Sequence, residues 1–446
     1  MKKIIFAILL LATSQVQGQE ILNLRSQAGL IDEINAERYS LLLPKLMEKE
    51  GIDMWVLISR EYNEDPILKT MLPAEWLSAR RRTMIVFYHD NAKKVNEQLA
   101  IARYNVGEKI KAAWDMKQFP DQWDALIDLI VKRNPKKIGL NYSNDYAHAD
   151  GLTFTEQKIF LDKLPASFKS KVVSAEKLGV AWLETRTERE MQLYPQLIQI
   201  THQIIAEGFS EKTIQPGVTT TDDLVWWFRQ RIRNLGLDTW FHPSVAIQRN
   251  DPENFEHLRA FSNRPKAELI QPGDLLHVDI GISYLRLNTD VQEHAYVLQP
   301  GETTAPTILQ KAFTKANRLQ DILTSQYVIG RTGNQILKGA LDQAKKEGIE
   351  ASIYTHPIGY HGHAAGPTIG LWDQQNGVPG SGDFPLHYNT AYSIELNAAT
   401  EVPEWKKTIR IMLEEDGFFN EKGFRFIGGR QKELLLIPRQ NSTIGN

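Results

Sequence analysis

The sequence contains no cysteine among its 446 residues. This absence excludes disulfide bonds, a thiolate nucleophile, an iron–sulfur cluster and a zinc site built on cysteine. Any metal ion would therefore bind to histidine, aspartate, glutamate or backbone oxygens. The chain also lacks an excess of either charge, with 52 Lys+Arg against 54 Asp+Glu, and it has no long basic run. Nucleic acid and acidic membranes are therefore not expected as partners.

Long hydrophobic runs are missing as well, apart from a short one near the N-terminus. Residues 4–12 (IIFAILLLA) are apolar and follow a basic Met-Lys-Lys start. A bilayer requires ~20 apolar residues, so this run is too short to cross one. The pattern predicts a signal peptide over residues 1–18, cleaved to leave Gln19 first. We therefore expect an exported protein, periplasmic or secreted, without a membrane span.

Helix and strand patterns alternate in the N-terminal part of the chain. Apolar strands are predicted at 54–58 and 84–88, and a helix at 122–133 precedes a third strand at 137–141. Such alternation predicts an α/β domain, which we place at residues 19–186. It offers no cluster of candidate catalytic residues.

A second domain is predicted at residues 187–440, because the pattern changes near Thr187. A long amphipathic helix starts there, and residues 219–223 form a helix N-cap ahead of another helix. Beyond residue 240 the chain is rich in strands and turns, with a helix pair at 306–325 and 334–347. This mixture indicates an α+β domain.

Two aspartates in this domain are candidate metal ligands. Asp279 lies in an apolar strand and Asp290 follows it by eleven residues. If residues 282–288 join two antiparallel strands, the two carboxylates can lie side by side. Buried like charges repel each other and are costly to desolvate unless a cation lies between them. For either aspartate alone, capping of a turn is the simpler interpretation.

Three of the eleven histidines, His356, His361 and His363, fall within eight residues of a glycine-rich segment. Neutral imidazole is a good metal ligand, and glycine lets a ligand approach the backbone closely. Metal binding, substrate contact and an ordinary surface loop are all consistent with this segment.

Glutamates interrupt two later apolar strands, at Glu395 and at the doublet Glu414-Glu415. Each of them alone could lie on a solvated face. Together with the two aspartates and one histidine they form an oxygen-rich ligand set with a single nitrogen. Such a set favours a pair of Mn, Co, Fe or Zn ions over a single Ca or Mg ion.

The order of these residues resembles that of the pita-bread metallopeptidase family, which includes aminopeptidase P, prolidase and the metal-free creatinase. The resemblance implies a creatinase-like α/β N-terminal domain and an α+β pita-bread catalytic domain. It also implies a peptide substrate, cleavage before proline and two divalent metal ions, with Mn expected ahead of Co, Fe or Zn. A homodimer is compatible with the resemblance. By this resemblance Asp279 is a terminal ligand and Asp290 and Glu415 bridge the two metals, while His363 and Glu395 complete the second position.

The same resemblance implies roles around the metals. Glu395 or a nearby acid would take a proton from the attacking water, and His257 and His361 would hold the substrate carbonyl. His356 and Arg430 are placed on the substrate side, although Arg430 could instead pair with an acid. Glu415 is chosen over Glu414 because it precedes Asp416 as in the family's Glu-Asp pair.

Two segments depart from the family pattern. Residues 292–294 read Gln-Glu-His where the family has Thr-Arg-Thr, and residues 371–373 read Leu-Trp-Asp where a His-Glu pair is usual. The alternative function is therefore a non-catalytic or metal-free creatinase-like protein that binds peptides or small molecules.

Overall fold

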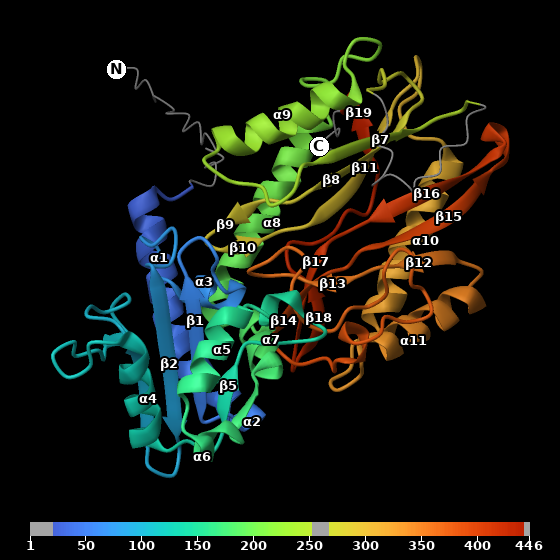
Figure 1. The fold of residues 1–446 in the computed structure, drawn as a ribbon. Coiled ribbons are helices and arrows are strands. Elements are labelled where there is room, and N and C mark those ends of the chain that lie inside the picture. The colour runs from blue at the N-terminus through green and yellow to red at the C-terminus, as the bar shows by residue number, and fades with distance from the viewer. Residues whose placement is uncertain (1–20, 252–266, 441–446) are drawn as a thin grey trace, which may run out of the picture.

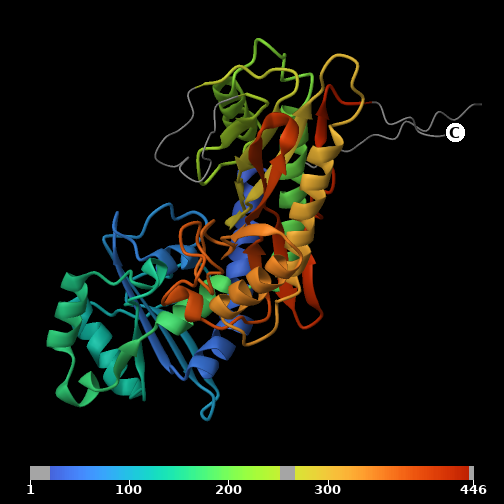
Figure 2. The same ribbon diagram turned by 90° about the vertical axis from the view of Figure 1, so that its right-hand side faces the viewer.

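The computed structural model describes residues 21–251 and 267–440 (Figures 1 and 2). The predicted signal peptide and His257 lie outside these residues. Within them, no helix is both long and apolar enough to cross a membrane. The elements of the N-terminal part are α1 (Leu24–Glu37), η1 (Arg38–Leu42), α2 (Leu43–Glu50), β1 (Met54–Arg60), α3 (Pro66–Met71), β2 (Arg82–Asp90), β3 (Val95–Ala100), β4 (Lys111–Ala112), α4 (Gln122–Arg133), β5 (Ile138–Leu140), η2 (Ala147–Ala149), α5 (Phe154–Lys163), α6 (Ala166–Lys169), β6 (Val172–Ser174) and α7 (Glu176–Glu184).

These elements form a six-stranded mixed sheet in the order β4-β3-β2-β1-β5-β6, with a hydrophobic cluster on each face. The three predicted strands correspond to β1, β2 and β5. Helix α4 has the predicted bounds because the Asp121 side chain accepts from Trp123 N–H at its start, and Asn134 adopts a left-handed φ of 48° at its end. The prediction of α/β structure in this part is confirmed.

The rest of the chain packs helices against several sheets, which are antiparallel except where β19 pairs parallel to β11. A four-stranded sheet has the order β19-β11-β8-β7, a second one β13-β14-β17-β18, and a three-stranded sheet β12-β15-β16. The elements are α8 (Glu188–Gly208), α9 (Thr221–Asn234), β7 (Ser244–Gln248), β8 (Leu275–Ile280), β9 (Ser283–Tyr284), β10 (Leu287–Asn288), β11 (Val291–Val297), α10 (Thr307–Thr324), α11 (Gly333–Lys346), β12 (Glu350–Ile353), β13 (His356–Pro357), η4 (Ser381–Asp383), β14 (Thr390–Ser393), β15 (Leu396–Val402), η5 (Pro403–Trp405), β16 (Lys407–Leu413), β17 (Asp416–Asn420), β18 (Gly423–Phe426) and β19 (Leu435–Ile437).

Helices α8 and α9, which match the helices predicted near Thr187 and after residues 219–223, each begin with a capping box. At α8 the Thr187 side chain accepts from Glu190 N–H, and the Glu190 carboxylate accepts from Thr187 N–H. Thr220 and Asp223 make the same reciprocal pair of bonds at α9. Both helices pack their apolar faces on β7, β8 and β11, whereas α10 and α11 cover β15 and β16. The mixture of helices and largely antiparallel sheets confirms the predicted α+β class.

The chain changes sheets at two points that matter for the site. Residues 394–395 separate β14 from β15, and residues 414–415 separate β16 from β17. The two apolar strands predicted at these places are therefore each interrupted at their glutamates. A backbone bond from Gln292 N–H to the Glu414 carbonyl, 3.0 Å, ties the second break to β11.

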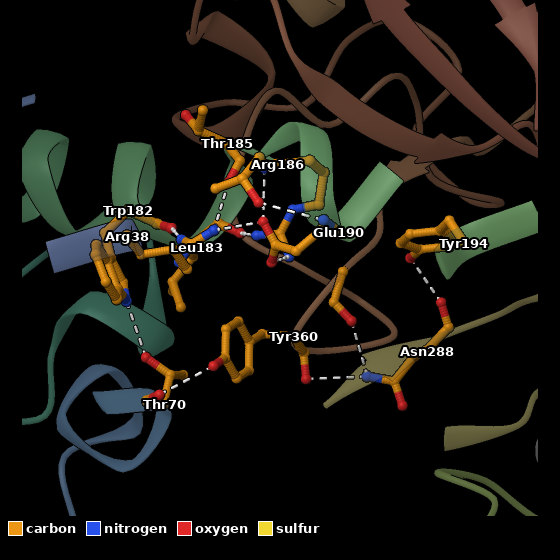
Figure 3. A network of polar contacts seen from close by, with 12 residues as sticks. Arg38, Thr70, Trp182, Leu183, Thr185, Arg186, Glu190, Tyr194, Asn288 and Tyr360 are labelled. Atoms are coloured by element: carbon orange, nitrogen blue, oxygen red, sulfur yellow. Dashed lines mark hydrogen bonds and ion pairs between the residues drawn. The ribbon is translucent and has the colours of Figure 1, made fainter. Parts of the chain in front are cut away.

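A buried charged network connects the two halves of the chain (Figure 3). Glu190 on α8 accepts from Arg38 Nη1 at 2.8 Å and from Arg186 Nη1 at 2.9 Å, and all three side chains are at most 2% exposed. Next to these arginines, the Tyr360 hydroxyl donates to the Thr70 carbonyl at 2.9 Å. Each Glu190 oxygen thus holds one arginine. Although burial alone would raise the Glu190 pKa, Arg186 and Arg38 lower it.

Replacing Glu190 with glutamine is expected to destabilise the protein strongly. The substitution leaves two buried guanidinium groups without a counter-charge, and breaking a buried pair in this way typically costs about 3–5 kcal/mol. Glu33→Gln is the matched control, because Glu33 is 62% exposed and pairs with the exposed Arg189. Urea unfolding of both variants measures the difference, and equal midpoints would contradict the role of Glu190.

Candidate metal centre

Five buried or half-buried side chains meet where the sheets of the C-terminal part adjoin. Asp279 comes from β8, Asp290 lies directly before β11 and His356 begins β13. Glu395 and Glu414 come from the two points where the chain changes sheets. Antiparallel pairing brings the first two together, because β8 and β11 align Asp279 with Gln292, whose side chain shares a face with Asp290. The predicted proximity of the two aspartates is confirmed.

The ligand atoms of these residues form two overlapping groups. Asp279, Asp290 and Glu414 can each place one oxygen within 4.8 Å of the others, and His356, Glu395 and Glu414 do the same with one nitrogen and two oxygens. His356 Nε2 lies 3.6 Å from Asp290 Oδ2 and 3.6 Å from Glu414 Oε1. Glu414 therefore belongs to both groups.

The electrostatics of the cluster are unfavourable without a cation. Burial raises the pKa of Asp279, Asp290 and Glu395 well above the usual range, and the nearby Glu414 carboxylate adds to each shift. Burial alone would lower the pKa of His356, but Glu414 raises it to about 9. Asp279 Oδ1, Asp290 Oδ1 and His356 Nε2 are buried without a hydrogen-bond partner. Such unpartnered atoms cost about 1–3 kcal/mol each, more when charged, so this donor set fits divalent cations.

Gln292 holds two of the carboxylates in place. Its Nε2 donates to Glu395 Oε1 at 2.6 Å and to Glu414 Oε2 at 2.7 Å. Its own Oε1 lies 2.8 Å from His277 Nε2, which fixes the orientation of the amide. Ser393 Oγ donates to the other Glu414 oxygen. The amide thus leaves one Glu395 oxygen unengaged while setting the angle of both glutamates.

Loss of the Gln292 amide is expected to weaken metal binding by about 10–100-fold, the usual effect of removing a group that orients metal ligands. Gln292→Leu keeps a comparable volume but removes both donors. Gln248→Leu is the control, since Gln248 is a buried glutamine whose side-chain amide bonds to the backbone of Arg410, away from the carboxylates. Calorimetric Mn²⁺ titration compares the two variants, and equal affinities would exclude the role of Gln292.

Glu415 does not join this cluster, and Glu414 lies where the resemblance implies Glu415. Its Oε2 lies 2.8 Å from His202 Nε2, and its Oε1 accepts from Gln431 N–H at 2.7 Å. Because neighbouring residues of a strand point to opposite faces, only one residue of the doublet can face the site. It is Glu414 that faces it, because the backbone pairing of Glu414 with Gln292 sets the register there.

Of the three clustered histidines, His356 and His363 lie with Asp290 in a further group that could hold a metal ion, so the ligand role of His363 stays a prediction. His356, expected on the substrate side, is the buried histidine that lies between the carboxylates. His363, expected as the metal ligand, is exposed and lies at the edge of the cluster, within reach of Asp290 and His356. Its ring centroid is 4.7 Å from that of His356 and 5.1 Å from that of Trp240.

Two further predicted site residues lie outside the two ligand groups. His361 faces His148 of the N-terminal part, with ring centroids 4.5 Å apart, and burial lowers the pKa of His361 to about 4. Arg430 pairs with Asp321 at 2.6 Å and stacks on Phe426, which matches the acid-pairing alternative rather than substrate contact. The structure does not bring either residue to the carboxylates.

Comparison with known proteins places this geometry in a family. The model of metallopeptidase family M24 matches residues 195–416, a segment that contains all five clustered residues. Through this segment the chain belongs to metallopeptidase family M24. This M24 peptidase has no match among curated protein sequences.

Solved structures share the fold of this M24 peptidase over most of its length. An X-Pro aminopeptidase from Thermotoga maritima MSB8 aligns with a TM-score of 0.61 at 16% identity, over 88% of this chain and 99% of its own. A putative aminopeptidase P from Bacillus anthracis aligns with a TM-score of 0.60 at 13% identity, over 90% and 96%. The prolidase from Pyrococcus horikoshii OT3 aligns with a TM-score of 0.55 at 13% identity, over 92% and 99%. These alignments include the N-terminal part and confirm the predicted pita-bread architecture.

Proposed function

We propose that this M24 peptidase hydrolyses the peptide bond that precedes proline, in short peptides, with two divalent cations bound by the five-residue cluster. The observation that carries the proposal is the sharing of Glu414 between two ligand groups, each compact enough for one ion. Asp279 and Asp290 would complete one group, and His356 and Glu395 the other. The preference for proline is inferred from the names of the structural neighbours, an X-Pro aminopeptidase and a prolidase among them.

The cations, when bound, would supply charge neutralisation and a Lewis acid that lowers the pKa of water toward neutrality. Mn²⁺ is the ion we propose, with Co²⁺, Fe²⁺ or Zn²⁺ as substitutes, because four of the five ligands are carboxylates. The side chains of the cluster would hold the ions in fixed positions before substrate arrives, so that little reorganisation is needed during the reaction.

The residues around the cluster have distinct parts in this proposal. Glu395 is a suitable proton acceptor, because Gln292 engages only its Oε1. His363 lies at the exposed edge, where its imidazole can donate to a substrate carbonyl as negative charge develops on the oxygen. His257, which lies outside the described residues, stays a predicted second donor. His361 faces away from the carboxylates, so we assign it no catalytic role.

Matched tripeptides test the proposed specificity. With Mn²⁺ present, kcat/KM for a peptide with proline at the second position is expected to exceed that for the alanine counterpart. The Xaa-Pro dipeptide, assayed alongside, separates an aminopeptidase from a dipeptidase. Equal rates for proline and alanine would discard the prolyl specificity and leave the metallopeptidase assignment intact. Activity that survives chelation and dialysis would contradict the metal centre itself.

A further inference from the structure

A second group of metal-ligating side chains lies on the opposite face of β11 from the five-residue cluster. It consists of His202 on α8, Glu293 on β11 and Glu415 between β16 and β17, and each can place one ligand atom within 4.8 Å of the others. Neighbouring residues of a strand point to opposite faces. Gln292 and Glu414 therefore face the first cluster, while Glu293 and Glu415 face α8.

Hydrogen bonds hold the Glu415 carboxylate of this second group in a fixed orientation. Glu415 is 1% exposed, and Gln431 N–H holds its Oε1, so that Oε2 faces His202. The Gln431 side chain is itself fixed, because it accepts from His294 N–H at 2.9 Å and donates to the His294 carbonyl at 2.7 Å. The carboxylate of Glu415 is thus oriented by the backbone before any ligand arrives.

Glu293 is the member of the group whose buried charge is only partly balanced by its neighbours. Its side chain is only 7% exposed, and no hydrogen bond reaches its carboxylate from the described residues. The nearest cationic group is His202 Nε2 at 3.7 Å, which exceeds hydrogen-bonding distance. Even a protonated imidazole would balance only one of the two carboxylates. A buried carboxylate whose charge is only partly balanced is costly unless a cation or a proton neutralises it.

We propose that His202, Glu293 and Glu415 bind a further divalent cation of the Zn²⁺ class, separate from the five-residue cluster. One imidazole and two carboxylates suit Zn²⁺, and ligand atoms at ~2.1 Å in a tetrahedron lie roughly 3.4 Å apart. The observed separations of 2.8 Å and 3.7 Å fall on either side of this value. His202 is 23% exposed, which leaves a route for the ion and room for water at the fourth position. The ion would link α8 to the sheet behind the first cluster.

Metal counting on the full-length protein tests this site. After equilibrium dialysis against Zn²⁺, His202→Gln is expected to bind one ion fewer per chain than the unmodified protein. His89→Gln is the matched control, because His89 also pairs with a glutamate, Glu48 at 2.9 Å, but lies in no three-ligand group of the described chain. An unchanged count in His202→Gln would overturn the proposal.

A complementary variant separates this site from the proposed catalytic centre. Asp279→Asn combined with His356→Gln disables both ligand groups of the five-residue cluster, yet it should keep one Zn²⁺ that is lost when His202→Gln is added. If this background binds no Zn²⁺, Glu293 holds a proton instead and the second site is disproved, whatever becomes of the first. Thermal unfolding without metal checks that each variant folds. Glu293→Gln, which is nearly isosteric, replaces His202→Gln if the latter does not fold, with the same expected loss.

Discussion

Replacing Glu414 with glutamine is expected to abolish peptide hydrolysis, with a loss on the order of 10³-fold or more in kcat/KM. Glu414 is the residue common to both ligand groups, so its loss weakens both cation positions at once. Metal ions typically contribute several kcal/mol to charge stabilisation in the transition state, and each ~1.4 kcal/mol is a factor of ten in rate. Glutamine matches glutamate in shape, so packing changes do not explain such a loss.

Glu415→Gln is the decisive comparison, because the two acids are adjacent in sequence and both are 1% exposed. The Glu415 carboxylate contacts His202 and the backbone of Gln431, away from the five-residue cluster. We expect this variant to retain turnover within about tenfold, with some loss of stability from its buried contacts. Mn²⁺ activation curves, read as turnover, compare the two variants under identical conditions. If Glu415→Gln were inactive and Glu414→Gln active, the metal-ligand role would belong to Glu415 instead of Glu414.

The choice between Glu414 and Glu415 could not be made from the local sequence. Strand alternation correctly implies that only one residue of the doublet faces the site. Which one depends on a sheet change at residues 414–415 and on the pairing of Glu414 with Gln292, a residue more than a hundred positions earlier. No counting along β16 alone reveals that register. By contrast, the proximity of Asp279 and Asp290 is predictable, because Asp279 lies on one strand of an antiparallel pair and Asp290 directly precedes the other strand.

The histidines show the same limit. The family resemblance favours His363 as the metal ligand, but His356 is the buried histidine of the three, and His363 is exposed. The His361 ring contacts the His148 ring in the N-terminal part, and no local motif predicts this contact. His202 carried no signal either, because it lies on an amphipathic helix whose relation to β11 depends on tertiary packing. The ligand types could thus be predicted from composition and order, whereas their orientation could not.

His356→Ala is expected to lose both metal and turnover, whereas His363→Ala should keep its metal and lose about 10²–10³ in rate, the usual effect of removing one donor to developing negative charge. His356 is buried, and its Nε2 has no hydrogen-bond partner although it lies 3.6 Å from two carboxylates. Removing it leaves one group with carboxylates only and an open ligand position. His363 reaches the cluster from an exposed position, where water can replace its imidazole as a neighbour of the ions.

Single-turnover rates and Mn²⁺ affinity, measured on the two variants side by side, distinguish these roles. For His356→Ala the apparent Mn²⁺ affinity should fall, and excess Mn²⁺ should restore part of the activity. For His363→Ala the affinity should match the unmodified enzyme, and added metal should restore nothing, because the missing group acts on the substrate. His387→Ala is the matched control, since the His387 ring lies beside Lys49, away from the carboxylates. Metal loss confined to His363→Ala would return the ligand role to His363 and place His356 on the substrate side.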